Sequence, residues 1–182
     1  MYFDAPGKDN TQKTIEIAVQ AIREYHIRHV VLATTTGYTA QCFPALEGVS
    51  VICVPHAYGF KEPGKNELSD ETIRQLQEKG FQVYFSSHAL SGAERGITGK
   101  FGGFSSIEIV AHTLRFFGQG MKVCVEIATM AADGGLLPPN TPILSIGGTG
   151  RGADTAVIMR AAHANHLLDT KIDRILCKPL LP

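Results

Sequence analysis

The sequence of 182 residues contains no tryptophan, four cysteines and no surplus of charge of either sign. The cysteines, Cys42, Cys53, Cys124 and Cys177, are far apart and form no C-x-x-C pair, which excludes a zinc knuckle and a thioredoxin-type redox motif. Seventeen basic residues balance seventeen acidic ones, so we expect no nucleic-acid partner. Cys53 and Cys124 lie among aliphatic residues, where a cysteine is typically a small buried apolar side chain.

Long apolar segments are also missing. No run reaches the ~18 apolar residues of a membrane-spanning helix, and residues 1–7 lack the basic and then apolar pattern of a secretory signal. We therefore expect a cytoplasmic protein that contacts no membrane. A chain of 182 residues that is 44% hydrophobic and 19% charged, without a low-complexity linker, is typical of a single globular domain over residues 1–182.

Hydrophobic periodicity predicts strands and helices that alternate along the chain. Strands are expected at 29–33, 49–54, 81–85, 141–146, 155–159 and 172–176, and helices at 11–26, 38–47, 70–79, 107–117 and 123–132. This order predicts an α/β protein with a mostly parallel sheet between two helical layers. Because no helical pattern separates the strands at 141–146 and 155–159, one late strand is expected to run antiparallel.

Small polar residues and glycines follow four of the predicted strands. Ligands of open α/β sheets bind beyond the carboxyl ends of the strands, so these residues are the candidate binding site. The candidates are Thr34, Thr35, Thr36, Gly37, Tyr38 and Thr39 after the first strand, His56, Tyr58 and Gly59 after the second, His88 after the third, and Gly147, Gly148, Thr149, Gly150 and Arg151 after the fourth. Nineteen glycines, about 10% of the chain against a usual ~7%, agree with ligand loops or tight turns.

The first of these segments runs from Thr34 to Thr39. Hydroxyls and free backbone N–H groups between a strand and a helix form a geometry that binds phosphate. The alternative is a helix cap whose hydroxyls meet only water.

The glycine-rich segment 147–152 partly matches a dinucleotide fingerprint, with Gly148, Gly150 and Ala153 at the required spacing. The fingerprint belongs to a first strand-to-helix turn, whereas a strand is expected here, so we discount it. Either this loop approaches a ligand, with Arg151 as one positive charge, or it is a tight turn between strands.

Segment 92–103 holds five glycines with Arg95 and Lys100 between them. We expect an irregular loop, either a mobile basic lid over an anionic ligand or a surface loop without function. It is not a P-loop, because the glycine that should precede Gly99-Lys100 is missing at the required distance.

Two further groups of polar residues stand out in the sequence. Glu126 lies in an apolar helical segment, so burial should require a partner such as an arginine or several backbone N–H groups. His163 and His166 could share a helix face, but no third ligand has suitable spacing, and no metal site is expected.

The segment 32–40, Leu-Ala-Thr-Thr-Thr-Gly-Tyr-Thr-Ala, resembles the phosphate-gripping loop of the C-terminal effector domain of pyruvate kinase. Over nearly its full length the chain is similar to the stand-alone pyruvate kinase C-terminal-domain-like proteins of archaea and bacteria. The segments that carry this similarity are 87–92, 95–96, 101–103, 122–128, 130–133, 146–149 and 152–156.

The resemblance implies a three-layer fold with a five-stranded core sheet, one strand antiparallel, and a bound phosphorylated ligand, with flavin mononucleotide (FMN) as the cofactor. Pyruvate kinase activity is not expected, because its catalytic barrel of ~250 residues cannot fit in this chain. Two alternatives stay open: a sensor of a sugar phosphate or nucleotide without catalysis, and a flavin-dependent oxidoreductase in which His56 or His88 relays protons. A homo-oligomer is possible.

Overall fold

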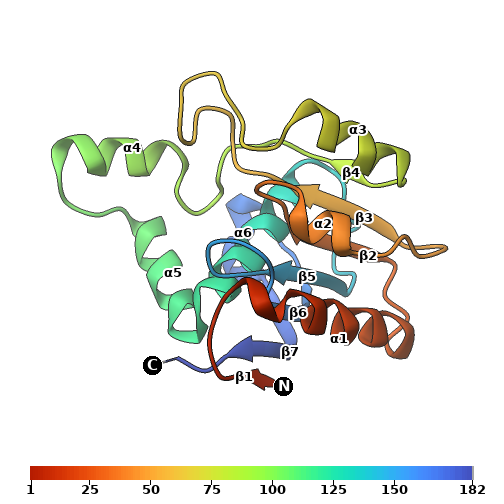
Figure 1. The fold of residues 1–182 in the computed structure, drawn as a ribbon. Coiled ribbons are helices and arrows are strands. Elements are labelled where there is room, and N and C mark those ends of the chain that lie inside the picture. The colour runs from red at the N-terminus through yellow and green to blue at the C-terminus, as the bar shows by residue number, and fades with distance from the viewer. Residues whose placement is uncertain (182) are drawn as a thin grey trace.

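Seven strands form one sheet in the order β1-β7-β6-β5-β2-β3-β4 in the computed structural model, which describes residues 1–181 (Figure 1). The strands are β1 (Tyr2–Phe3), β2 (His29–Ala33), β3 (Ser50–Val54), β4 (Gln82–Val83), β5 (Ile143–Gly147), β6 (Thr155–Arg160) and β7 (Lys171–Pro179). Strand β6 is antiparallel to both of its neighbours, and the remaining pairs are parallel. The prediction of a mostly parallel sheet with one late antiparallel strand is confirmed.

Helices lie on both faces of the sheet (Figure 1). The helices are α1 (Thr11–Glu24), α2 (Tyr38–Cys42), α3 (Asp70–Glu78), α4 (Gly92–Phe101), α5 (Ser106–Leu114) and α6 (Gln119–Asp133), with short 3-10 helices η1 (Lys8–Asn10), η2 (Arg115–Phe117) and η3 (Ala164–Asp169). Side chains of α1, α2 and α3 pack on one face, and those of α5 and α6 on the other. Among residues 1–181, none of these helices has the length and apolar character needed to cross a membrane.

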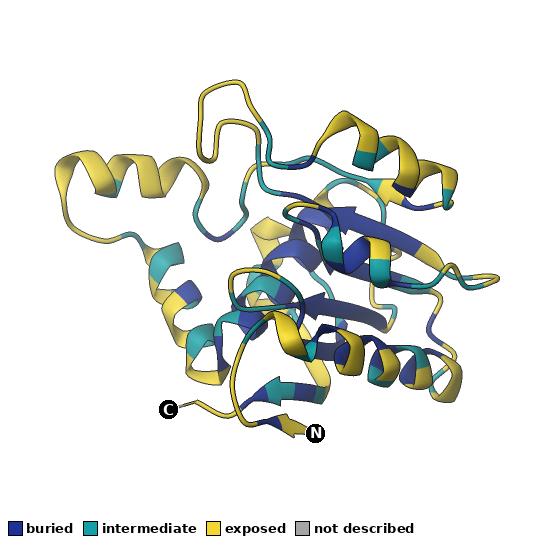
Figure 2. Ribbon diagram, viewed as in Figure 1, coloured by how far each residue is buried: buried dark blue, intermediate teal, exposed yellow. Residues whose placement is uncertain are grey.

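The alternation of side chains along β2 shows how the two cores arise. Val30 and Leu32 pack with α1 in one cluster, whereas Val31 packs with α6 in the other. Successive residues of a strand point to opposite faces, so a central strand covered on both sides needs an unbroken apolar run. Figure 2 shows the resulting buried centre of the sheet.

The order of the strands creates a crevice at one edge of the sheet. From β2 the chain moves to β3 and β4 on one side, and it then returns to place β5 on the other side of β2. The carboxyl ends of β2 and β5 therefore lie side by side where the strand order reverses. In open α/β sheets this switch point is where ligands bind.

Several predicted boundaries are corrected by the structure. Helix α2 ends at Cys42 because Phe43 is extended before Pro44, a position that disfavours helical backbone. The strand expected at 81–85 is paired only at Gln82–Val83 on the sheet edge, and the helix expected at 11–26 ends at Glu24. The two-residue β1 was not predicted, so the sheet has seven strands where the resemblance implied a core of five.

The expectation of an irregular loop over residues 92–103 is wrong. Residues Gly92–Phe101 form helix α4, and Gly102 and Gly103, both with positive φ, follow its end. Helix formers such as Ala93 and Glu94 between the glycines sustain the turns, although each interior glycine costs ~1 kcal/mol relative to alanine. None of its residues is buried, and Figure 2 shows α4 projecting from the body as an exposed arm.

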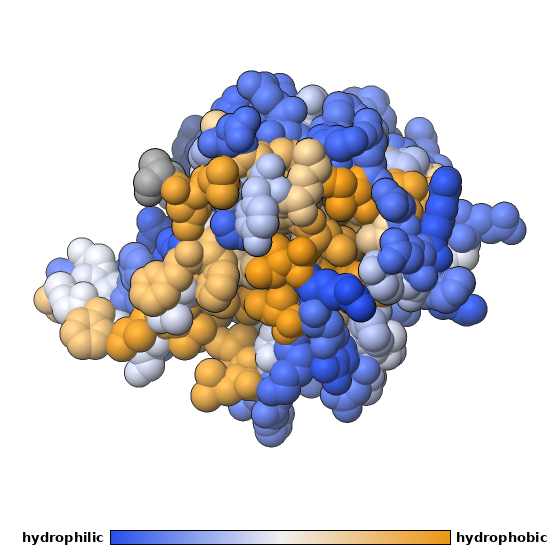
Figure 3. Space-filling model, turned by 90° about the horizontal axis from the view of Figure 1, so that it is seen from below, coloured by the Kyte–Doolittle hydropathy of each residue, from blue (hydrophilic) through white to orange (hydrophobic). Residues whose placement is uncertain are grey.

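An apolar surface lies on the underside of the molecule (Figure 3). The two ends of the chain and η2 supply exposed large apolar side chains: Met1, Tyr2, Phe116, Phe117, Leu180 and Leu181. These segments are neighbours, since β1 pairs with β7 and Leu181 packs close to Gly118, just after η2. Exposed apolar patches of this kind are common at protein contacts.

Helix α4 should be the least protected helix of the molecule. An isolated helix of ten residues is marginal in water, and α4 has no buried residue, whereas α6 has twelve. In native-state hydrogen exchange, we expect the amides of α4 to exchange at least 100-fold faster than those of α6. Equal protection of α4 and α6 from exchange would contradict the view that α4 packs little against the rest of the protein.

Candidate ligand-binding site

A cavity of about 210 Å³ lies at the switch point of the sheet. The loops after β2 and β5 form two of its walls, and residues of α6 form its floor. It is lined by Ala33, Thr34, Thr35, Thr36, Tyr38, Thr39, Val54, Pro55, His56, His88, Gln119, Val123, Glu126, Ile127, Met130, Gly148, Gly150, Arg151 and Gly152. Segments that are more than 100 residues apart in the sequence thus meet at one place.

Most of the predicted site residues line this cavity. Ten of the fifteen do so: Thr34, Thr35, Thr36, Tyr38, Thr39, His56, His88, Gly148, Gly150 and Arg151. Tyr58 and Gly59 instead line an adjoining hollow, and Gly37, Gly147 and Thr149 lie outside the lining. Gln119, Val123 and Glu126 on α6 were not predicted. The apolar pattern of this helix indicated packing against the sheet and gave no sign that one face of the helix also lines a cavity.

The loop after β2 leaves two hydroxyls for a ligand. Thr34 is buried, and its hydroxyl donates to the carbonyl of Leu32 at 3.3 Å. Thr35 is half-buried and Thr36 exposed, and within residues 1–181 neither hydroxyl has a hydrogen-bond partner. Because α2 has only five residues, its N-terminus adds little charge, and an anion here would depend on hydroxyls, backbone N–H groups and nearby cations.

Gly37 shapes this loop without lining the cavity. Its φ of 94° is in the left-handed region, and a Cβ atom there would lie 2.4 Å from Cγ2 of Thr72 on α3. Both the backbone conformation and the close approach of α3 therefore require glycine.

A buried carboxylate holds the loop between β5 and β6. Asp154 accepts hydrogen bonds from the backbone N–H groups of Gly7 (3.0 Å) and Thr149 (3.1 Å) and from the hydroxyl of Thr155 (2.8 Å). It is fully buried and thus ties the loop to the N-terminal segment. The sequence did not reveal the role of this carboxylate, because acidic residues are also common in surface turns rich in glycine.

The glycines of the same loop permit a very tight path. A Cβ on Gly148 would lie 2.3 Å from the carbonyl oxygen of Gly152, and one on Gly147 would lie 2.5 Å from that of Gly120. Replacing either residue would deform the free protein itself. At the tip of the loop, Arg151 is exposed beside the cavity and supplies a positive charge.

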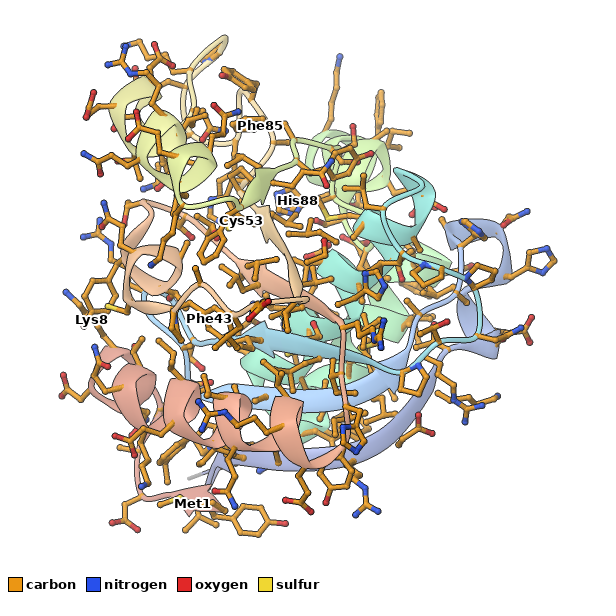
Figure 4. The ribbon with its side chains drawn as sticks, turned by 90° about the vertical axis from the view of Figure 1, so that its right-hand side faces the viewer. Met1, Lys8, Phe43, Cys53, Phe85 and His88 are labelled. Carbon is orange, nitrogen blue, oxygen red and sulfur yellow. The ribbon has the colours of Figure 1, made fainter. Side chains whose placement is uncertain are left out.

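Lys8 supplies a second positive charge near the cavity mouth. Its Nζ lies 4.1 Å from the ring centroid of Tyr38, which lines the cavity, and its backbone packs against Gly152. Figure 4 shows Lys8 at the end of the molecule where η1 meets α2. Sequence reasoning missed Lys8 because it is about 140 residues from the loop that it contacts.

Glu126 is the buried charge at the floor of the cavity. Its carboxylate pairs with Lys122 one turn earlier on α6, accepts the backbone N–H of Leu90 at 3.0 Å, and lies 3.5 Å from Nδ1 of His88. Burial raises the pKa of this carboxyl, but His88 and Lys122 outweigh burial and bring the pKa to about 2. The predicted need for partners is confirmed, although the cation is a lysine and only one backbone N–H takes part.

A second histidine-carboxylate pair lies nearby. Nδ1 of His56 is 2.6 Å from Glu67, which also pairs with Lys61 at 2.5 Å. Burial raises the pKa of Glu67, but its bonds to Lys61 and His56 outweigh this and lower it. The rings of His56 and His88 are 5.5 Å apart, and Phe60 packs beside both.

The adjoining hollow has a volume of about 260 Å³ and shares His88 with the cavity. Tyr58, Phe60 and the first turn of α4, including Arg95, line it. Tyr58 packs on Phe85 with ring centroids 5.0 Å apart, and Figure 4 shows Phe85 and His88 along the segment that follows β4. Residues 92–103, for which a lid and a surface loop without function were both expected, therefore line this second hollow with the first turn of α4.

The remaining candidate residues lie elsewhere. His163 pairs with Asp133 at 3.1 Å and His166 with Asp169 at 3.8 Å, all at the surface. Within the described part of the chain, no three metal-ligating side chains come together. All four cysteines are free, and Cys53 and Cys124 are buried, as their aliphatic neighbours predicted.

No protein-family model matches the chain. The resemblance to pyruvate kinase effector domains thus stays a hypothesis that depends on the motifs of the sequence.

Neutralising Glu126 should remove one defined part of the acid sensitivity of the fold. The fall in its pKa from 4.5 to about 2 corresponds to roughly 3 kcal/mol of stability, present above pH 4.5 and lost as the pH falls toward 2. We expect Glu126→Gln to lower the free energy of unfolding at pH 7 by about that amount and to flatten its decline below pH 4.5 in urea titrations.

Glu71→Gln is the matched control, because Glu71 pairs with Arg74 on an exposed helix surface. It should change stability by less than ~1 kcal/mol. If Glu126→Gln changes the free energy of unfolding as little as this control does at every pH, ionisation of the buried carboxylate does not stabilise the fold.

Proposed function

We propose that this protein binds a phosphorylated small molecule at the switch-point cavity. The observation that carries the proposal is the meeting of two loops there: one offers the free hydroxyls of Thr35 and Thr36, the other a glycine backbone with Arg151. Lys8 adds positive charge at the mouth. Hydroxyls, exposed backbone N–H groups and cations at a strand end form the chemistry that recognises phosphate.

FMN is the ligand that we propose first, because the resemblance to pyruvate kinase C-terminal-domain-like proteins implies it. The cavity of about 210 Å³ is smaller than the ~300–1,000 Å³ of sites that enclose a drug-sized ligand. FMN would therefore place its phosphate and ribityl chain in the cavity and its ring system in the hollow lined by Tyr58 and Phe60. The aromatic side chains there can stack on a flat ring.

The small volume also supports the alternative, in which the protein senses a sugar phosphate or nucleotide without catalysis. A sugar phosphate fits the cavity without the second hollow. Neither ligand requires pyruvate kinase chemistry, which we propose is absent. A cytoplasmic location and a homo-oligomer remain predictions, and sedimentation velocity would test the second.

Ligand-induced stabilisation distinguishes the two ligands. We expect FMN to raise the melting temperature and riboflavin, which has no phosphate, to do so much less. At 100 times its Kd a ligand adds ~2.7 kcal/mol to stability. If ribose 5-phosphate stabilises the protein as well as FMN does, the sensor alternative is favoured.

Variants of the loops test the location of the site. Thr35→Val and Arg151→Gln should each weaken FMN binding about tenfold, the loss of ~1.4 kcal/mol of charge-assisted bonding, with little change in the stability of the free protein. Arg74→Gln, at an exposed arginine on α3, is the control and should bind normally. Lack of binding by FMN, ribose 5-phosphate and inorganic phosphate alike would refute the proposed function.

A further inference from the structure

One polar atom at the cavity has no partner. Nε2 of His88 is buried and, within residues 1–181, makes no hydrogen bond, although the ring lines both the cavity and the adjoining hollow. Buried polar atoms in folded proteins nearly always have a partner, and an exception at a cavity needs a specific explanation. A group on the ligand is the natural partner for this nitrogen.

The surroundings of His88 determine what this nitrogen can do. Glu126 lies 3.5 Å from Nδ1, long for a hydrogen bond but typical of sites that tighten when substrate binds. A carboxylate that is held ionised by Lys122 favours the proton on Nδ1, so the lone pair of Nε2 is free to accept a proton. A base and its orienting group are the arrangement used in general-base catalysis.

His56 completes a pair of proton-transfer groups. Its Nδ1 contacts Glu67, and its ring centroid is 5.5 Å from that of His88, close enough for both to reach neighbouring atoms of one substrate. Each histidine thus has a carboxylate, and each carboxylate has a lysine, Lys61 or Lys122.

We propose that the cavity is an acid-base catalytic site that isomerises small phosphorylated hydroxyaldehydes or hydroxyketones, with His88 as the base. This proposal rests on the proposed phosphate binding at the same cavity. In the reaction, the C–H bond beside the carbonyl breaks and its proton passes to Nε2 of His88. The electron pair forms the C=C bond of an enediol, because the carbonyl oxygen takes a proton from protonated His56 in the same step.

The second half of the reaction restores both histidines. His88 returns its proton to the former carbonyl carbon, and the hydroxyl on the other carbon gives its proton to His56 as the new carbonyl forms. The atoms and electrons balance without an oxidant or reductant. Glu126 is a positioning residue, because it contacts His88 and not the reacting atoms.

The size and the polar lining of the cavity favour this substrate class. A volume of about 210 Å³ suits a phosphorylated sugar of three to five carbons, with phosphate at the threonine loop and the carbonyl near the histidines. The apolar side chains of Val123, Ile127 and Met130 on α6 line the same space and limit the access of water.

The test measures exchange of carbon-bound protons in D2O by proton NMR, with dihydroxyacetone phosphate and ribose 5-phosphate as probes. Saturation-transfer NMR on the same samples reports whether each probe binds. We expect the wild-type protein to exchange the proton beside the carbonyl, and His88→Gln to slow this exchange by ~10²–10⁴ while the probe still binds. His163→Gln is the matched control, since His163 also has a carboxylate partner but lies at the surface.

A second readout needs no ligand. The nitrogen-15 spectrum of His88 should show the proton on Nδ1 in the wild-type protein and a mixture of tautomers in Glu126→Gln, which a merely structural role would not produce. A proton on Nε2 in the wild-type protein would overturn the proposal. Probes that bind without exchange would overturn it too and leave the proposed function intact, whereas binding of FMN alone would overturn the substrate class.

Discussion

A carboxylate buried at the floor of the cavity organises the candidate site. Glu126 is on α6, yet it holds the backbone of Leu90 and lies beside His88, so it joins α6 to the segment that follows β4. A charge in this position is tolerated only with partners, and Lys122 supplies the compensating charge. The need to satisfy one buried charge thus determines where the imidazole of His88 lies relative to the loops after β2 and β5.

The architecture was largely predictable from the sequence. Apolar runs such as β2 and β3, separated by helical patterns, indicate a parallel sheet that is covered on both faces. The absence of a helical pattern between β5 and β6 identified the antiparallel strand. Local propensity misled where tertiary context is weak: the glycine-rich stretch Gly92–Phe101 is helical although none of its residues is buried. The two-residue β1 exists only through its pairing with β7, which no local pattern shows.

Only the part of the candidate site that lies at the ends of strands was predictable from the sequence. The rule that ligands bind beyond the carboxyl ends of strands located the threonine loop, His56, His88 and Arg151 from strand positions alone. Residues that contact the site from elements other than these strand ends could not be found by this rule. Lys8 arrives from the N-terminal segment and Glu126 from a helix, so their contacts with Tyr38 and His88 depend on packing between distant parts of the chain.

The central claim is that the switch-point cavity of this protein holds a phosphorylated small molecule. Its most direct test is mass spectrometry, together with phosphorus NMR, of the small molecules released on denaturation of protein purified under native conditions. The account predicts a phosphate ester, FMN or a sugar phosphate, that is retained by the wild-type protein and lost from Arg151→Gln. A wild-type protein that releases no phosphorylated compound, or a ligand that Arg151→Gln retains in full, would contradict it.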